Sequence, residues 1–135
     1  MTGKCKTAVA ILVGGLLAAA CHTEMLYQVQ RHPLPQSLQQ KLGENDEAKL
    51  IADAALASGW KSMPIKPGQI RAILNISDKH SATADILYDL QSFSIMLVSS
   101  DNLKQDDQGH IHREYNRAVH RLENTIDSFL MRAAY

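Results

Sequence analysis

Four histidines carry the strongest metal-binding chemistry in this sequence. His110 and His112 are separated by one residue, and His80 and His120 stand elsewhere in the chain. Imidazoles two positions apart in a loop can share a metal ion, and a third ligand would complete an open site. The sequence contains neither an HExxH nor a CxxC pattern. We therefore expect no metal site, and we assign these histidines structural or solvent-exposed roles.

Two polar segments are weaker candidates for catalysis or ion binding. Residues 99–102 (Ser-Ser-Asp-Asn) hold two serines, but no GxSxG or SxxK pattern surrounds them. Asp106 and Asp107 precede Gly109, but the ligand spacing of an EF-hand loop is missing. Both segments are typical of turns, so we expect a protein that is not an enzyme and has no cofactor.

Cys21 is the residue whose surroundings point to covalent modification. Lys4 and Lys6 form a positively charged start, and residues 8–20 are an unbroken run of apolar residues and glycine. A membrane-spanning helix needs about 20 residues, so this run has the length of a signal-peptide core instead. The segment Leu17-Ala18-Ala19-Ala20-Cys21 resembles a bacterial lipobox. The resemblance implies that cleavage leaves Cys21 as the first residue and that Cys21 carries the lipid.

Two other interpretations of this segment stay open. Ala18-Ala19-Ala20 also fits an ordinary secretory signal, whose removal would leave a soluble periplasmic protein with a free Cys21. The segment could also remain as an uncleaved anchor. We favour a lipoprotein signal peptide over residues 1–20, a short lipid-anchored tether over residues 21–24 and a single domain over residues 25–135. By analogy with Gram-negative lipoproteins, His22 in place of an aspartate favours the outer membrane, with the domain facing the periplasm.

Composition limits the classes to which the domain can belong. The chain has 135 residues with 14 Lys and Arg against 14 Asp and Glu, which argues against a nucleic-acid binder driven by bulk charge. Removal of residues 1–20 leaves 12 cationic and 14 acidic residues and one cysteine. An intramolecular disulfide is then impossible, so a hydrophobic core must hold the fold.

Period-two and helical patterns alternate along the rest of the chain. Strands are predicted where apolar residues alternate, over residues 25–30, 69–77, 82–88 and 93–99. A helix is predicted from Asn45 or Asp46 to a stop at Gly59, and a short extended piece follows from Trp60. Residues 36–44 are polar and predict a loop.

The C-terminal segment from Ile111 to Leu130 predicts an amphipathic helix with one wide apolar stripe. Arg113, Arg117 and Arg121 repeat on its other side and suit a solvated face, anionic headgroups or an acidic partner. The predicted fold is therefore α+β, with an antiparallel sheet of four or five strands and two amphipathic helices packed on one face.

A set of short motifs in fixed order resembles a group of small proteobacterial lipoproteins of unknown function. The motifs include Gly59-Trp60, Pro67-Gly68-Gln69-Ile70-Arg71-Ala72, His80-Ser81-Ala82, Ile86-Leu87-Tyr88-Asp89, Phe93-Ser94-Ile95, Ser100-Asp101-Asn102-Leu103 and Ile111-His112-Arg113-Glu114-Tyr115-Asn116-Arg117. The resemblance runs from Asp46 to about Leu130. It implies a lipid-anchored envelope location and a compact α+β fold, and it implies no activity.

If the helices cover one face of the sheet, a set of apolar residues must lie on the other face. These residues are Leu26, Ile73, Leu87, Met96 and Val98. An exposed apolar patch of this kind is typical of an interaction surface. We therefore expect a lipid-anchored envelope protein with a non-catalytic structural, assembly or protein-binding role, whose partner is another envelope protein or a second copy. The alternative is a periplasmic binder of a small apolar ligand, held between the sheet and the helices.

Overall fold

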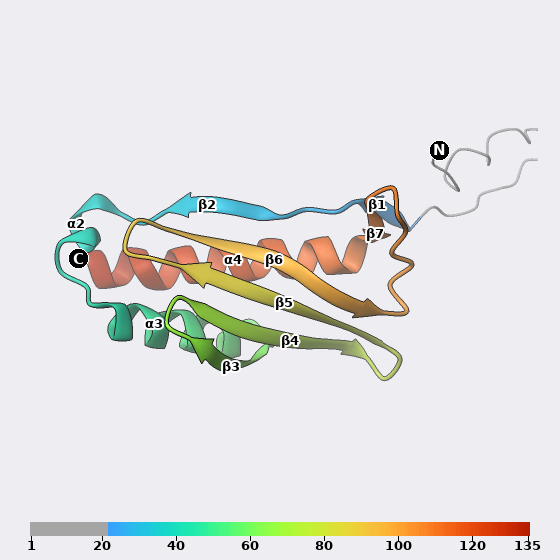
Figure 1. The fold of residues 1–135 in the computed structure, drawn as a ribbon, viewed down its shortest axis with the longest axis horizontal. Coiled ribbons are helices and arrows are strands. Elements are labelled where there is room, and N and C mark those ends of the chain that lie inside the picture. The colour runs from blue at the N-terminus through green and yellow to red at the C-terminus, as the bar shows by residue number, and fades with distance from the viewer. Residues whose placement is uncertain (1–21) are drawn as a thin grey trace, which may run out of the picture.

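The structure of the protein is a computed structural model, and it describes residues 22–135. Figure 1 shows an elongated arrangement with β1 and β7 at one end and the C-terminus and α2 at the other. In chain order the elements are β1 (Thr23–Met25), β2 (Val29–Pro33), α2 (Gln36–Gln39), α3 (Glu44–Ala57), β3 (Lys61–Lys66), β4 (Gln69–Ser77), β5 (His80–Tyr88), β6 (Ser92–Asp101), β7 (His110–His112) and α4 (Arg113–Ala134).

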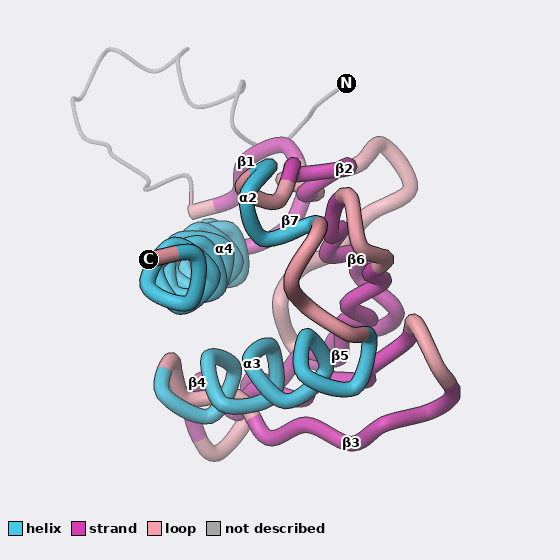
Figure 2. Tube along the Cα trace, turned by 90° about the vertical axis from the view of Figure 1, so that its left-hand side faces the viewer, coloured by secondary structure: helices cyan, strands magenta, loops and turns pink. Residues whose placement is uncertain are grey.

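The main sheet has five antiparallel strands in the order β2-β6-β5-β4-β3. A separate two-stranded sheet pairs β1 with β7. Figures 1 and 2 show α3 and α4 on the same side of the main sheet, which curls around them. The predicted α+β class is therefore confirmed, with a five-stranded antiparallel sheet and two long helices on one face.

The three central strands bury alternate residues, as their period-two patterns predict. Their inward side chains face each other across β4 and β5 in the pairs Ile70–Ile86, Ala72–Ala84 and Leu74–Ala82, all buried. The turn between β3 and β4 consists of Pro67 and Gly68, and Gly68 has a φ of +86°. Proline followed by a residue with positive φ is the sequence of a type II turn, so local chemistry sets this hairpin.

The amphipathic helix α4 supplies a large share of the core. Its buried side chains recur at intervals of three and four residues: Tyr115, Asn116, Ala118, Val119, Leu122, Ile126, Leu130 and Ala134. The helix begins at Arg113, and Ile111 belongs to β7 instead of to the helix. The backbone N–H of Glu114 donates to the His112 side chain, which caps the helix at that point.

The cap of helix α3 lies two or three residues earlier than predicted. Its N-cap residue is Gly43, whose carbonyl oxygen accepts from the backbone N–H groups of Asp46 and Glu47. The assignment of Asn45 or Asp46 as the cap is therefore wrong, because the backbone of Gly43 closes the first turn without a side-chain cap. The predicted stop at Gly59 is confirmed, since its φ of +93° is the left-handed conformation that ends a helix.

The strand predicted over residues 25–30 is wrong in its extent. The structure divides this segment into β1 and β2, and the residues between them bond elsewhere. The backbone N–H of Leu26 donates to the carbonyl of Gly109 at 2.7 Å, and that of Tyr27 donates to Asn116 Oδ1 at 2.8 Å. Both partners lie far along the chain, so local alternation could not reveal them.

The predicted tether is also shorter than expected. Thr23 and Glu24 pair with His112 and Ile111 in the β1–β7 ladder. The ladder therefore holds these two residues in the fold, and the carbonyl of His22 accepts from the backbone N–H of Arg113. The reason is again a partner distant in the sequence.

One segment predicted as a loop forms a helix, and the short extended piece predicted after Trp60 forms a full strand. Residues 36–39 make the short helix α2, which buries Leu38. Residues 61–66 make the edge strand β3 in spite of Pro64. An edge strand tolerates proline because one side of its backbone has no neighbouring strand to which it must donate.

Candidate interaction surface

The face of the main sheet turned away from the helices is defined by the strand register. Met63 on β3 lies opposite Arg71 on β4, Arg71 opposite Asp85 on β5, and Asp85 opposite Met96 on β6. We call this side of β3–β6 the outer face. It is the surface that the sequence predicts for interaction.

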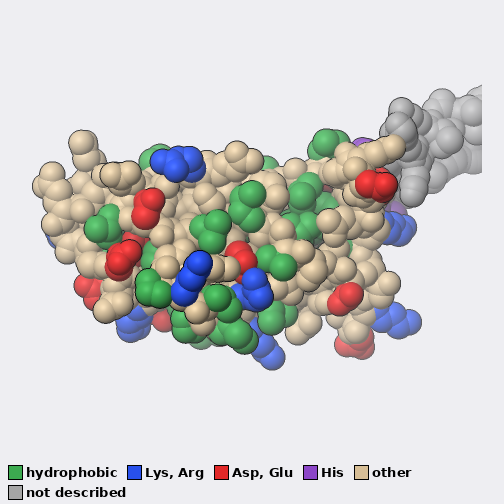
Figure 3. Space-filling view, in the orientation of Figure 1, with side chains coloured by type: hydrophobic (Ala, Val, Ile, Leu, Met, Phe, Trp, Pro, Cys, Tyr) green, Lys and Arg blue, Asp and Glu red, His purple; other side chains and the backbone are tan. Residues whose placement is uncertain are grey.

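Apolar side chains on the outer face remain accessible to solvent. Met63 is 50% exposed, Leu87 41% and Val98 47%, while Ile73 and Met96 are half-buried. Figure 3, which looks onto this face, shows hydrophobic side chains spread over the strands with charged groups among them. Four of the five predicted surface residues, Ile73, Leu87, Met96 and Val98, therefore share one face.

Leu26 does not belong to this group. It lies between β1 and β2 and packs, half-buried, against the core. The structure therefore removes Leu26 from the predicted surface, because the strand that would have placed it there does not exist.

Met63 is an exposed residue of the outer face that the sequence analysis did not include. The alternation of Lys61, Met63 and Ile65 was the signal, hidden by Pro64.

A β-bulge sets the exposure of Val98. Thr83 pairs with Ser99, but the next residue, Ala84, pairs with Leu97, so Val98 is an extra residue in β6. A bulge bends its strand and turns a side chain out of the regular alternation. Val98 thus protrudes beside the half-buried Met96.

An ion pair lies at the centre of the outer face. Arg71 donates to the two carboxylate oxygens of Asp85 at 2.8 and 3.0 Å, and Gln69 donates to the same carboxylate at 2.9 Å. The hydrogen bond from Arg71 holds the pKa of Asp85 below its usual value. The centre is thus electrically neutral and hydrogen-bonded, with apolar residues around it.

Cationic side chains lie at the rim of the outer face. Lys61 lies opposite Ile73, and Lys66 lies opposite Gln69, whose other neighbour is Leu87. Arg31 lines a hollow of about 240 Å³ together with Leu87 and Asp89. Arg31 also has a φ of +55°, and its backbone N–H donates to Ser94 Oγ at 2.9 Å. Three cations thus surround the apolar residues, with Asp89 as the acidic residue in that hollow.

The four histidines weighed as metal ligands lie in different environments. His110 contacts Asp106, His120 stacks on the Tyr27 ring, and His80 and His112 lie with their ring centroids 6.5 Å apart. Within residues 22–135, no group of three His, Cys, Asp or Glu side chains is arranged to hold a metal ion.

A partly buried polar network joins β2 to α4, and the sequence analysis did not find it. The two ring nitrogens of His32 lie 2.8 Å from Glu123 Oε2 and 3.0 Å from Asp127 Oδ1. Tyr27 donates its hydroxyl to Glu123 at 2.6 Å, which raises the pKa of Tyr27 to about 12. Glu123 and Asp127 are one helical turn apart, so both carboxylates lie on the same side of α4. This spacing is the feature of the sequence that could have indicated the network. The network fastens the N-terminal strand to the helix.

The arginines of α4 do not form one uniform stripe. Arg117 donates to Glu114 at 2.8 Å within the exposed first turns, whereas Arg113 is half-buried. An exposed ion pair of this kind contributes little to stability. Arg117 therefore fits the solvated face that the sequence favours.

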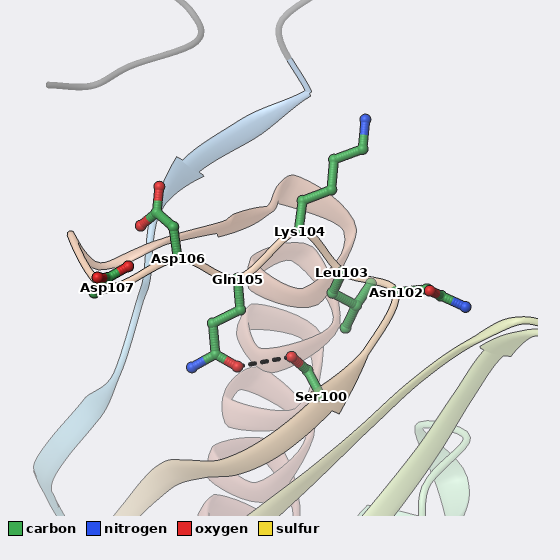
Figure 4. A pocket seen from close by; sticks show the side chains of 7 residues that line it. All are labelled: Ser100, Asn102, Leu103, Lys104, Gln105, Asp106 and Asp107. Atoms are coloured by element: carbon green, nitrogen blue, oxygen red, sulfur yellow. Dashed lines mark hydrogen bonds between the residues drawn. The ribbon is translucent and has the colours of Figure 1, made fainter.

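Two further hollows lie on the surface. One, of about 480 Å³, is formed by the loop after β6, where Ser100 donates to Gln105 at 2.7 Å and Lys104 projects outward (Figure 4). Residues 99–102, expected at a turn or a strand end, lie at the end of β6 and the start of this loop, and Asp106 and Asp107 lie within the loop, whose lining is mostly polar. The other hollow, also about 480 Å³, lies between the start of α3 and the end of β3, where Ile65 and Tyr88 meet Glu44 and Lys66.

Comparisons with known proteins give no further identification. No family model, no curated protein and no solved structure matches this chain. Among the described residues, no helix combines the length and the apolar character needed to cross a membrane. Cys21 and the segment before it lie outside the described residues. Both the resemblance to small lipoproteins and the assignment of Cys21 thus stay predictions.

Proposed function

We propose that the protein is a lipid-anchored envelope protein, held at the outer membrane through Cys21, whose domain faces the periplasm and binds another envelope protein. The role is non-catalytic. The observation that carries the proposal is the outer face, where Met63, Leu87 and Val98 are exposed on the open side of the sheet. Exposed apolar patches of this kind are typical of protein interfaces.

The position of β1 favours a protein over the bilayer as the occupant of this face. The carbonyl of His22 accepts from the N–H of Arg113 at 2.8 Å, and Met25 accepts from the Asn116 side chain at 2.7 Å. β1 is thus bound to the first turns of α4, in the layer of the helices (Figure 2). A lipid attached just before β1 would bring that side to the membrane and leave the outer face open to the periplasm.

The charges at the rim define the chemistry of the partner. Lys61, Lys66 and Arg31 surround the apolar residues, while Arg71 and Asp85 neutralise each other at the centre. Complementary potentials favour association and select against wrong partners. The partner surface is therefore expected to be apolar at its centre and acidic around its edge.

The test replaces two apolar residues of the outer face by charges. The double variant Leu87→Lys with Met96→Lys should keep the melting temperature of the parent and lose cross-links to the envelope partner. The control is Leu56→Lys, because Leu56 is a highly exposed apolar residue on α3, away from this face. Cross-links of this control should be unchanged.

Two results would count against the proposal. Unfolding of the double variant would show that these residues belong to the core. A folded double variant with unchanged cross-links would show that the face is merely exposed. Loss of cross-links only between copies of this chain would assign the face to self-association.

A further inference from the structure

Three histidine rings meet at the end of the molecule where β1 begins. His22 precedes β1, His80 is the first residue of β5, and His112 is the last residue of β7. The rings of His22 and His112 stack with centroids 5.7 Å apart, and those of His80 and His112 are 6.5 Å apart. Ser77 Oγ lies 2.7 Å from His80 Nδ1 and fixes that ring. His112 is therefore the centre of a small histidine cluster.

The hydrogen bond of His112 requires the neutral imidazole. Its Nδ1 accepts from the backbone N–H of Glu114 at 3.2 Å and so caps α4. A ring that accepts through Nδ1 carries its single proton on Nε2. A second proton would occupy Nδ1, remove the cap and add positive charge where the helix dipole is already positive.

The other groups around His112 mostly oppose this second proton. Burial lowers the pKa of His112 most, followed by the nearby His22 ring, with smaller contributions in the same direction from Lys104 and His80. Glu114 is the neighbour that favours the charged form. The fold thus stabilises neutral His112, and this stabilisation is complete above the ordinary histidine pKa of 6.5 and is lost as the pH falls below it.

The opposite end of β7 is attached to the preceding loop by contacts that do not involve His112. His110 Nδ1 lies 3.1 Å from Asp106 Oδ2, and the Asp106 carboxylate also accepts from the backbone N–H groups of His110 and Gln108. Acid therefore loosens β7 at His112, while its other end stays attached to the loop.

We propose that protonation of His112 detaches β1 from β7 and so lengthens the link between Cys21 and the domain. Thr23 pairs directly with His112, so the ladder opens from that end. Opening must also break the bonds that Asn116 makes to Glu24 and Met25. The opened segment ends at Tyr27, because the backbone N–H of Tyr27 donates to Asn116 and its hydroxyl donates to Glu123.

The released segment covers residues 22–26. Five extended residues span about 17 Å, so a domain held against the bilayer at neutral pH gains that reach at acid pH. This consequence depends on the proposed lipid anchor. The opening of β1 does not, and the two can fail separately.

Hydrogen exchange of single backbone amides tests the opening in the full chain in detergent micelles. The reporters are the N–H of Leu26, bonded to Gly109, and that of Arg113, bonded to His22. Between pH 7.5 and pH 5, after correction for intrinsic exchange, their protection should fall at least about fivefold, the equivalent of one lost helix cap. Ala84, in the central strand β5, should keep its protection.

The matched control is His112→Asn. Asparagine caps helices well and does not titrate, so the reporters should lose their dependence on pH. This variant changes His112 alone and leaves the contacts of His32 with its two carboxylates in place. Equal acid loosening in His112→Asn, or none in the parent, would overturn the proposal.

A second variant keeps the proposal testable if His112→Asn does not fold. His22→Gln with His80→Gln removes the two neighbouring rings and leaves His112 in place. Because those two rings oppose the second proton on His112, opening should then occur at a higher pH than in the parent, and an unchanged midpoint would overturn the proposal. A parent that opens as expected but carries no lipid would refute the proposed anchor alone.

Discussion

The carboxyl group of Glu47 lies in the core near the start of α3. Its side chain is fully buried, and neither carboxyl oxygen has a hydrogen-bond partner among the described residues. Burial, with the nearby Asp89 and Glu44 carboxylates, raises the pKa of Glu47 to about 8. Glu47 is therefore a neutral acid at pH 7, since an unpaired charge in the core would be far more costly.

We expect the stability of the domain to fall between pH 4.5 and pH 8 because of Glu47. In this range the folded protein keeps the proton that the unfolded chain has lost, so unfolding becomes easier as the pH rises. The slope is about 1 kcal/mol per pH unit. Glu47→Gln should remove most of this slope, as measured by urea unfolding at several pH values.

The control for this prediction is Glu44→Gln. Glu44 is exposed and lies one turn before Glu47 on the same helix. This variant should retain the slope, because the buried carboxyl is still present. A slope that persists in Glu47→Gln would assign the pH dependence to other groups, such as the His32 network.

Among the elements, α4 connects the most parts of the fold. It contacts α3, α2 and β7, and through Asn116, Glu123 and Asp127 it fastens the N-terminal strands. Its apolar stripe was the clearest helical pattern in the sequence. The sheet therefore depends on α4 both as a hydrophobic cover and as the site of long-range polar bonds.

Leu122→Ala should destabilise the domain strongly. Leu122 is fully buried in the middle of α4, and such a truncation typically costs about 2–5 kcal/mol of a total of about 5–15. The melting midpoint should fall clearly. The control, Asn124→Ala, changes an exposed residue of the same helix and should leave the midpoint nearly unchanged. Equal effects of the two would mean that a different face of α4 is buried.

The strands show where sequence patterns succeed. β4 spans the predicted residues 69–77, because its alternation and its turn at Pro67-Gly68 are local features. β5 and β6 begin and end within two residues of their predictions. β1 and β7 were not predicted, because a ladder of three pairs between residues 85 to 89 positions apart leaves no periodic pattern.

At the scale of the whole molecule, β1 and the outer face lie on different sides. The sheet separates the helices, to which β1 is bound, from Met63, Leu87 and Val98 (Figures 1 and 2). A protein anchored before β1 can therefore present this face to a partner without lifting off the membrane. This separation would make the proposed anchoring and the proposed binding compatible in a small domain.

Cys21→Ser should release the protein from the membrane fraction or cause it to accumulate unprocessed. The physical reason is that a lipid on Cys21 would supply the attachment, since a cleaved chain keeps no apolar run long enough to span the bilayer. Cell fractionation and the mass of the mature chain measure both outcomes. Unchanged membrane association with an unchanged mass would refute lipidation.

The sequence by itself determined the α+β class, the two amphipathic helices and the central strands, since each depends on the periodicity of neighbouring residues. It also placed Ile73, Leu87, Met96 and Val98 opposite the core, because strand alternation is local. Only the tertiary structure showed that Leu26 packs against the core, that β1 pairs with β7 and that His22, His80 and His112 form a cluster. These features depend on hydrogen bonds and ring contacts between residues mostly far apart in the chain, and such contacts leave no signal in the local order of residues.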